Sequence, residues 1–132
     1  MSEILNNWIF VFWICVLLHL IADYNLQGIL ANMKQVSWWR KQTTDKKYEH
    51  DWIAALMCHS FMWAIFTFLP LMFLIKPCVF SAIVILNAML HACIDVIKAN
   101  LLGINLVEDQ ILHIVQITAT IYICYIICTI SV

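Results

Sequence analysis

Long apolar runs alternate with short polar connections along this chain. Four runs, at about 4–30, 52–75, 78–97 and 110–131, contain few charged residues. An α-helix rises about 1.5 Å per residue, so roughly 20 residues cross the hydrocarbon layer of a bilayer. The pattern therefore predicts an all-α protein, in which residues 1–132 form one integral membrane domain, a four-helix bundle.

The composition agrees with this prediction. Hydrophobic residues make up 64% of the 132 residues and charged residues only 11%, with two prolines and two glycines to interrupt helices. Soluble domains carry about 25% charged residues. An ordinary soluble domain is therefore excluded. No stretch resembles a nucleic-acid-binding surface, and the expected partners are membrane lipids.

The basic residues predict how the helices are oriented. Five of the seven lie in the connection 31–51: Lys34, Arg40, Lys41, Lys46 and Lys47. Basic connections tend to stay on the cytoplasmic side of the membrane. Four spans would then place both termini outside. Lys98 would join the cytoplasmic side, and Lys76 would lie outside.

Seven ionisable residues interrupt the apolar runs, and six of them form pairs four residues apart. The pairs are His19–Asp23, His91–Asp95 and Asp109–His113, and His59 lies in the second run. Residues at i and i+4 share one helix face. In the predicted topology all four histidines reach a similar depth, with the aspartates one turn closer to the cytoplasm. Ionisable residues at membrane depth usually mark a functional site.

Imidazole and carboxylate ligands together suit Zn, Mn or Fe. We therefore predict a centre of one or two divalent transition metal ions. Its predicted ligands are all seven residues: His19, Asp23, His59, His91, Asp95, Asp109 and His113. Seven groups exceed the four of a closed zinc site, which favours a metal-dependent hydrolase acting on a phosphorylated or lipid-linked substrate from the cytoplasmic side. Asp109 and Asp95 are the predicted catalytic groups, with Asp109 as the base that activates water.

Several polar residues near the cytoplasmic helix ends are assigned supporting roles. Gln27 and Gln110 are predicted to orient the ligands through hydrogen bonds, as outer partners of metal sites do. Arg40 and Lys41 are predicted to attract an anionic substrate at the membrane surface. Tyr24 is predicted to donate a hydrogen bond to that substrate.

Two other uses of the same residues remain open. Chains of His and Asp also form proton and ion pathways in membranes, so the alternative is an ion- or proton-translocating protein or an oligomeric phage-type membrane effector. The outer halves of the four runs carry few polar residues, which favours a pocket open on one side over a pore. Hydrogen bonding that only holds helices together is the third interpretation. A small bundle of this kind is also a candidate homo-oligomer.

Four segments carry a resemblance to a known family. They are HLIADYNLQ (19–27), CHSFMWAIFTFLPLM (58–72), HACIDVIKANL (91–101) and DQILH (109–113). In this order they resemble a family of small bacterial and phage membrane proteins of unknown function, with motifs His-x3-Asp-aromatic-x-Leu-Gln, a His-led second helix, His-x2-Ile-Asp and Asp-x3-His. Tyr24 stands where that family more often has Phe, and Val96–Ile97 where an aromatic or basic pair is common. The resemblance implies a bacterial inner membrane and a shared site, and it leaves the reaction undefined.

Overall fold

The chain is helical throughout the part that the structure describes. The computed structural model describes residues 2–130, and no strand occurs in that range. The elements in chain order are α1 (Ser2–Ile21), η1 (Ala22–Leu26), α2 (Leu30–Met33), α3 (Val36–Gln42), η2 (Lys46–Tyr48), α4 (Asp51–Thr67), η3 (Leu69–Phe73), α5 (Pro77–Ala99) and α6 (Leu106–Ile130). The prediction of an all-α fold is confirmed.

Three helices are long and apolar enough to cross a membrane: Asn7–Leu26, Pro77–Ala99 and Leu106–Ile130. They correspond to the first, third and fourth predicted spans. The third and fourth begin slightly earlier than predicted. Residue 131, the predicted end of the fourth span, lies outside the described residues.

The first span ends earlier than the predicted residue 30. After Ile21 the helix widens into the π-helical turn η1, which ends at Leu26. Gly28 then adopts a φ of +48°, a left-handed conformation that an α-helix cannot accommodate. The chain therefore turns at Gly28 and continues as the separate short helix α2.

The second predicted span, 52–75, is not one α-helix. α4 ends at Thr67, and the 3₁₀ helix η3 follows with Pro70 near its start. Proline has no backbone N–H to continue the helical ladder, and it disfavours α-helical geometry in the residue before it. The 17 residues of α4 extend about 25 Å at 1.5 Å per residue. This helix is consequently not among the three that can span a membrane by themselves.

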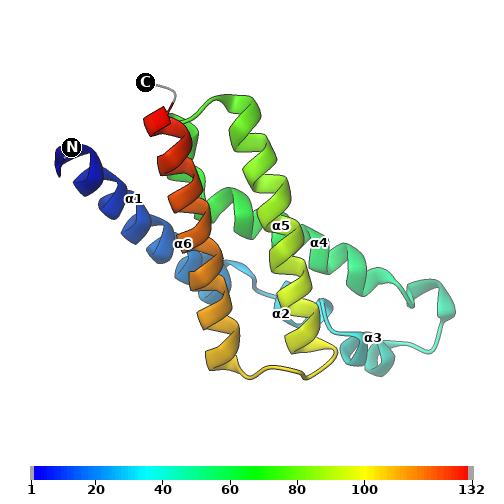
Figure 1. Cartoon of the computed structure of the whole chain (residues 1–132). Helices are drawn as coiled ribbons and strands as arrows, with labels where there is room; N and C mark the ends of the chain where they lie inside the picture. Colours follow the sequence, from blue (N-terminus) through cyan, green and yellow to red (C-terminus); the bar gives the residue numbers. More distant parts are fainter. Residues whose placement is uncertain (1, 131–132) are drawn as a thin grey trace.

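The four longest helices surround a common interior. α4 packs on α5, α5 on α6, α6 on α1, and α1 on α4. Figure 1 shows α5 and α6 side by side and running in opposite directions. The beginning of α1 and the end of α6 lie at the same end of the molecule, where the ring centroids of Trp8 and Tyr125 are 6.1 Å apart.

An apolar core fills the part of this interior nearest those two helix ends. Its small residues, such as Cys15, Ala64 and Ala88, are fully buried and let the helix backbones approach closely. The buried core residues are Cys15, Ala22, Trp63, Ala64, Phe68, Leu71, Val84, Ala88, Ile117, Ile121 and Cys124. The other part of the interior is lined by buried polar side chains.

The basic connection 31–51 is more ordered than the predicted loop, because it contains α2, α3 and η2. It docks against the last residues of α5. The side chain of Asn100 donates a hydrogen bond to the carbonyl of Lys34 (3.2 Å) and accepts one from the N–H of Val36 (2.8 Å). The basic connection and the α5–α6 connection therefore lie at the same end of the molecule.

The left-handed turn at Gly28 allows a direct test. Gly28→Ala is expected to destabilise the protein by about 1 kcal/mol, because a Cβ disfavours this backbone conformation. No atom lies within 4 Å of the position that the Cβ would occupy, so backbone strain is the only penalty. Thermal unfolding in detergent measures the change. Gly28→Asn is the matched control and should lose less stability, since asparagine tolerates this conformation better.

Candidate metal centre

All seven predicted ligands meet in the polar part of the interior. They come from α1, η1, α4, α5 and α6, and each is at most 7% exposed. We call this group the His–Asp cluster. Its members are His19, Asp23, His59, His91, Asp95, Asp109 and His113.

Asp23 occupies the centre of the cluster because the π-helical turn η1 carries it there. Its Oδ1 lies 3.6 Å from Nε2 of His59 and 3.9 Å from Nε2 of His91. Its Oδ2 faces the other way, 3.8 Å from Nδ1 of His19. π-Helical turns are rare and occur frequently at functional sites. The i, i+4 pairing of His19 and Asp23 was visible in the sequence, and the π turn was not.

Asp95 approaches the same two imidazoles from α5. Its Oδ2 lies 3.4 Å from Nε2 of His59 and 3.5 Å from Nε2 of His91, and these two nitrogens are 3.1 Å apart. Ligands about 2.1 Å from a tetrahedral metal ion lie roughly 3.4 Å from one another. The two histidine nitrogens lie at about that spacing from each other and from one oxygen each of Asp23 and Asp95, so either carboxylate completes a set of three candidate ligand atoms with them.

Further groups of ligand atoms converge beside this set. Three combinations each offer atoms within 4.8 Å of one another: Asp23–His59–His91, His91–Asp95–His113 and Asp23–Asp109–His113. Asp23 belongs to two of these combinations, one with His59 and His91 and one with Asp109 and His113, so it is the residue that connects the two halves of the cluster.

Several polar atoms in the cluster have no hydrogen bond with any described residue. They are both ring nitrogens of His113, Nδ1 of His91 and Oδ1 of Asp109, and all are buried. His113 Nε2 and Asp109 Oδ1 lie 3.4 Å apart without forming a hydrogen bond. Buried polar groups nearly always have a partner. These atoms are thus available to a ligand that the protein alone does not supply.

His19 differs from the other three histidines. Its Nδ1 accepts a hydrogen bond from the indole N–H of Trp63 (2.8 Å), and its Nε2 lies 3.1 Å from Oε1 of Gln110. Both ring nitrogens are thus engaged by the protein. His19 also belongs to none of the three ligand combinations. Its geometry suits a residue that orients Gln110, whose amide in turn donates to Asp23, better than it suits a direct ligand.

Two lysines enter the cluster, and the sequence interpretation assigned them only to topology. Lys34 is 8% exposed, and its Nζ lies 2.7 Å from Oδ2 of Asp95. Lys98 forms an ion pair with Oδ2 of Asp109. The spacing of Lys98, three residues after Asp95 on α5, was a signal available in the sequence. The sequence contained no such signal for Lys34, because the position of Lys34 depends on how α2 docks against the rest of the protein.

These lysines determine the charge of the site. Three carboxylates and two ammonium groups leave one negative charge when the imidazoles are neutral, the form in which they bind metals. The site therefore favours a cation, and less strongly than three unpaired carboxylates would.

Trp63 is a third residue whose role the sequence interpretation missed. Besides its hydrogen bond to His19, its ring stacks on His91 with the centroids 4.1 Å apart. Trp63 lies one helical turn after His59, so the same face of α4 carries both. It fixes two imidazoles from two other helices.

The predicted supporting residues divide into two groups. The Gln110 amide donates to Oδ2 of Asp109 (3.1 Å) and of Asp23 (3.4 Å), which is the predicted orienting role. Gln27 instead donates to the backbone carbonyl of Asp23, and its Oε1 has no partner among the described residues.

The three predicted substrate-binding residues lie away from the cluster contacts. Tyr24 is 57% exposed, and Arg40 lines a separate pocket of about 560 Å³ with Trp39 and His50. Lys41 is exposed in the last turn of α3. None of the three forms a hydrogen bond or ion pair with the cluster in residues 2–130.

Comparison with known proteins adds no assignment to this geometry. No family model, curated protein or solved structure matches the chain. The resemblance to small bacterial and phage membrane proteins therefore stays a prediction from the motifs.

Proposed function

We propose that this protein is a membrane-embedded, metal-dependent hydrolase whose His–Asp cluster holds one or two divalent transition metal ions. One observation carries the proposal. Four buried ligand atoms, Nε2 of His59 and His91, Oδ1 of Asp23 and Oδ2 of Asp95, have separations of 3.1–3.9 Å in the five pairs measured. Three ligand atoms at that spacing, the two nitrogens and either carboxylate oxygen, suit zinc or a similar ion that keeps a further position open.

A membrane location is supported by the outer surface as well as by the three long helices. Large apolar side chains face outward along them, including Trp13 on α1, Leu86 on α5 and Tyr122 on α6. In a soluble protein such an extended apolar surface would be a liability. We place α4, continued by η3, as the fourth crossing, and the end that carries α2, α3 and Lys98 on the cytoplasmic side. The charge bias of the sequence supports that orientation.

The remaining cluster residues supply the rest of the chemistry. A bound metal ion would polarise a phosphoryl or acyl oxygen and lower the pKa of a coordinated water. Asp109 keeps Oδ1 without a hydrogen bond while Lys98 holds Oδ2. Asp109 can therefore accept a proton from the attacking water. Asp95 has the second catalytic role, and Lys34 beside it would stabilise negative charge that develops on the substrate.

Ion or proton translocation is the second candidate, and one observation favours it. Polar contacts continue along α6 beyond His113. The Gln116 side chain donates a hydrogen bond to Oδ1 of Asn87 (3.0 Å), and the Thr120 hydroxyl donates one to the same oxygen (3.0 Å). Beyond Thr120 the interior is apolar at Ile121 and Cys124. This apolar end favours a pocket that is open on one side rather than a continuous ion or proton path. Voltage-dependent flux in liposomes that disappears in His→Ala variants would favour translocation instead.

The hydrolase proposal predicts the effect of a single-atom change. Asp109→Asn is expected to lower the rate of phosphate release from lipid phosphomonoesters by about a hundredfold or more, the usual contribution of a general base. Because Asp109 is also a candidate ligand, metal content is measured on the same samples and the rate is expressed per bound metal ion. Glu108→Gln is the matched control, because Glu108 is the exposed neighbouring carboxylate and glutamine keeps its capping geometry. Equal loss in both variants, or an unchanged rate in Asp109→Asn, would remove Asp109 from the reaction.

A further inference from the structure

A pocket of about 230 Å³ lies directly beside the His–Asp cluster. It is formed by η1, α2 and α4, and its lining is almost entirely apolar. His59 belongs both to the wall of this pocket and to the cluster, and Trp63 in the same wall contacts His19 and His91 of the cluster. His59 therefore connects the pocket to the cluster, because its Nε2 lies 3.6 Å from Oδ1 of Asp23 and 3.4 Å from Oδ2 of Asp95.

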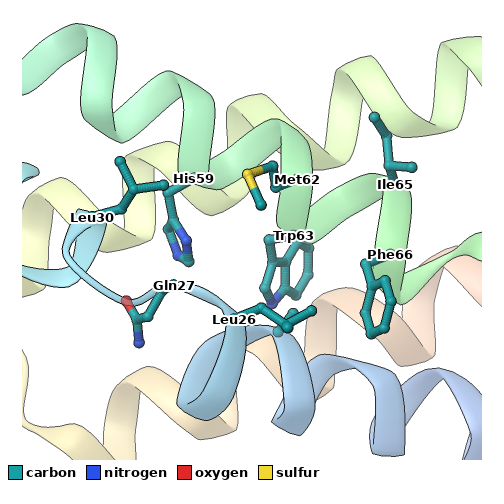
Figure 2. A pocket seen from close by; sticks show the side chains of 9 residues that line it. Leu26, Gln27, Leu30, His59, Met62, Trp63, Ile65 and Phe66 are labelled. Atoms are coloured by element: carbon teal, nitrogen blue, oxygen red, sulfur yellow. The ribbon is translucent and has the colours of Figure 1, made fainter.

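The two ends of the pocket differ in polarity. Figure 2 shows His59 and Gln27 at one end and Ile65 and Phe66 at the other, with Trp63 between them. His59 and Phe66 are seven residues apart on α4, a distance of about 10 Å along the helix. An apolar pocket that leads to His59 and Gln27 at its cluster end matches a molecule with a hydrocarbon chain and a headgroup at one end.

The size of the pocket limits which molecule fits. An apolar cavity of about 150 Å³ accommodates benzene, and pockets for whole drug-sized ligands measure about 300–1,000 Å³. A volume of about 230 Å³ therefore suits a single chain and excludes two. Met62 and Ile65 at its edge are each 48% exposed, so the pocket opens sideways. In the proposed membrane placement this opening faces the lipid.

The charge next to the polar end indicates the headgroup. Leu30 of α2 lines the pocket, and Lys34, one turn later, reaches Asp95 with its ammonium group. His59 Nε2 is 3.4 Å from the same oxygen of Asp95. Lys34 already neutralises Asp95, and the proposed divalent ion would change the net charge of the cluster from −1 to +1. With that ion bound, an anionic phosphate-type headgroup would be favoured beside His59.

We infer that this pocket binds the hydrocarbon chain of the substrate, a single-chain amphiphile with a phosphate-type headgroup, and so holds the headgroup against the His–Asp cluster. The inference deepens the proposed function and rests on it for the reaction. Chain binding itself is measurable without any reaction.

The test uses decyl phosphate with a diazirine at the end of its chain, added to the protein in phosphatidylcholine nanodiscs. After irradiation, mass spectrometry of peptides maps the adducts. We expect them at Ile65 and Phe66, the apolar end of the pocket. Unlabelled decyl phosphate should compete for labelling, whereas inorganic phosphate should not. Competition by inorganic phosphate alone would overturn chain recognition and indicate a free phosphate site.

A pocket-filling variant tests the same inference by another route. Met62→Trp should reduce labelling at least about tenfold, because the bulky indole replaces the volume that the chain would fill. Met89→Trp is the matched control, since Met89 is similarly exposed on α5 and lies outside this pocket. Labelling spread evenly over outward residues such as Leu86 and Tyr122, and equal in both variants, would overturn the inference.

Zinc content, measured on the same samples, separates this result from the proposed function. Both tryptophan variants should bind as much zinc as wild type, because neither changes a predicted ligand. Pocket labelling in a protein that binds no metal would overturn the hydrolase proposal while establishing the chain site. Bound metal without pocket labelling would overturn the chain site and leave the hydrolase proposal standing.

Discussion

Replacing His91 with alanine is expected to leave the protein without bound transition metal. His91 belongs to two of the three ligand combinations, and its Nε2 is within 4 Å of three other ligand atoms, on Asp23, His59 and Asp95. Loss of an outer partner of a metal ligand already weakens binding by about 10–100-fold, so loss of a ligand should exceed that range. Mass spectrometric metal analysis of detergent-purified protein, loaded with zinc, manganese or iron, measures the effect.

His50→Ala is the matched control for this experiment. His50 is an exposed histidine at the start of α4, outside the cluster, so its removal should leave metal content unchanged. His113→Ala should lose metal as His91→Ala does, and circular dichroism verifies that both variants remain helical. A wild type that stays empty after loading, or a His91→Ala variant that binds as wild type does, would contradict the metal centre. The translocation candidate would then be tested by flux.

Replacing Lys34 with methionine is expected to destabilise the metal-free protein by about 3 kcal/mol, because removing one partner of a buried ion pair leaves the other charge uncompensated. The pair joins Lys34 Nζ to Asp95 Oδ2 at 2.7 Å, with both side chains nearly buried. Thermal unfolding in detergent with a chelator present measures the loss. Lys41→Met, at an exposed position on α3, should change stability by no more than about 0.5 kcal/mol.

A double variant and added metal provide two further tests of the Lys34–Asp95 ion pair. Lys34→Met with Asp95→Leu should recover much of the lost stability, since no unpaired charge then remains. Zinc should stabilise Lys34→Met more than wild type, because a metal ion can compensate Asp95 where the ammonium group no longer does. An equal effect of zinc on both proteins would mean that Lys34 and the metal do not share Asp95.

The cluster itself was largely predictable because its main determinants are local. Helical spacing of four residues places both members of each pair on one face, whatever the partner helices are. The structure keeps His91 and Asp95 at 3.5 Å and Asp109 and His113 at 3.4 Å. The separation of basic and apolar residues likewise predicted that the connections carrying Lys34 and Lys98 would share one end, and they do.

Other features were not predictable because they depend on how helices pack against one another. The contact of Trp63 with His19 joins α4 to α1, and the burial of Lys34 depends on the docking of α2 against Asn100. The widening of the helix at Asp23 has no distinct sequence pattern, since a π turn differs from an α turn only in its hydrogen bonding. The break in the second predicted span was also missed, because the α-helix ends at Thr67, before Pro70.

The sequence by itself determined the helical class, the approximate position of three of the four predicted spans and the face on which each histidine and aspartate lies. These properties follow from hydropathy and from a fixed helical repeat, which every residue carries locally. Only the tertiary structure decided which of those residues share ligand spacing, that His19 is held by Trp63 and Gln110, and that two lysines balance the carboxylates. It also decided that a pocket adjoins His59. Such contacts arise between segments far apart in the chain, where small differences in packing set distances of a few ångströms.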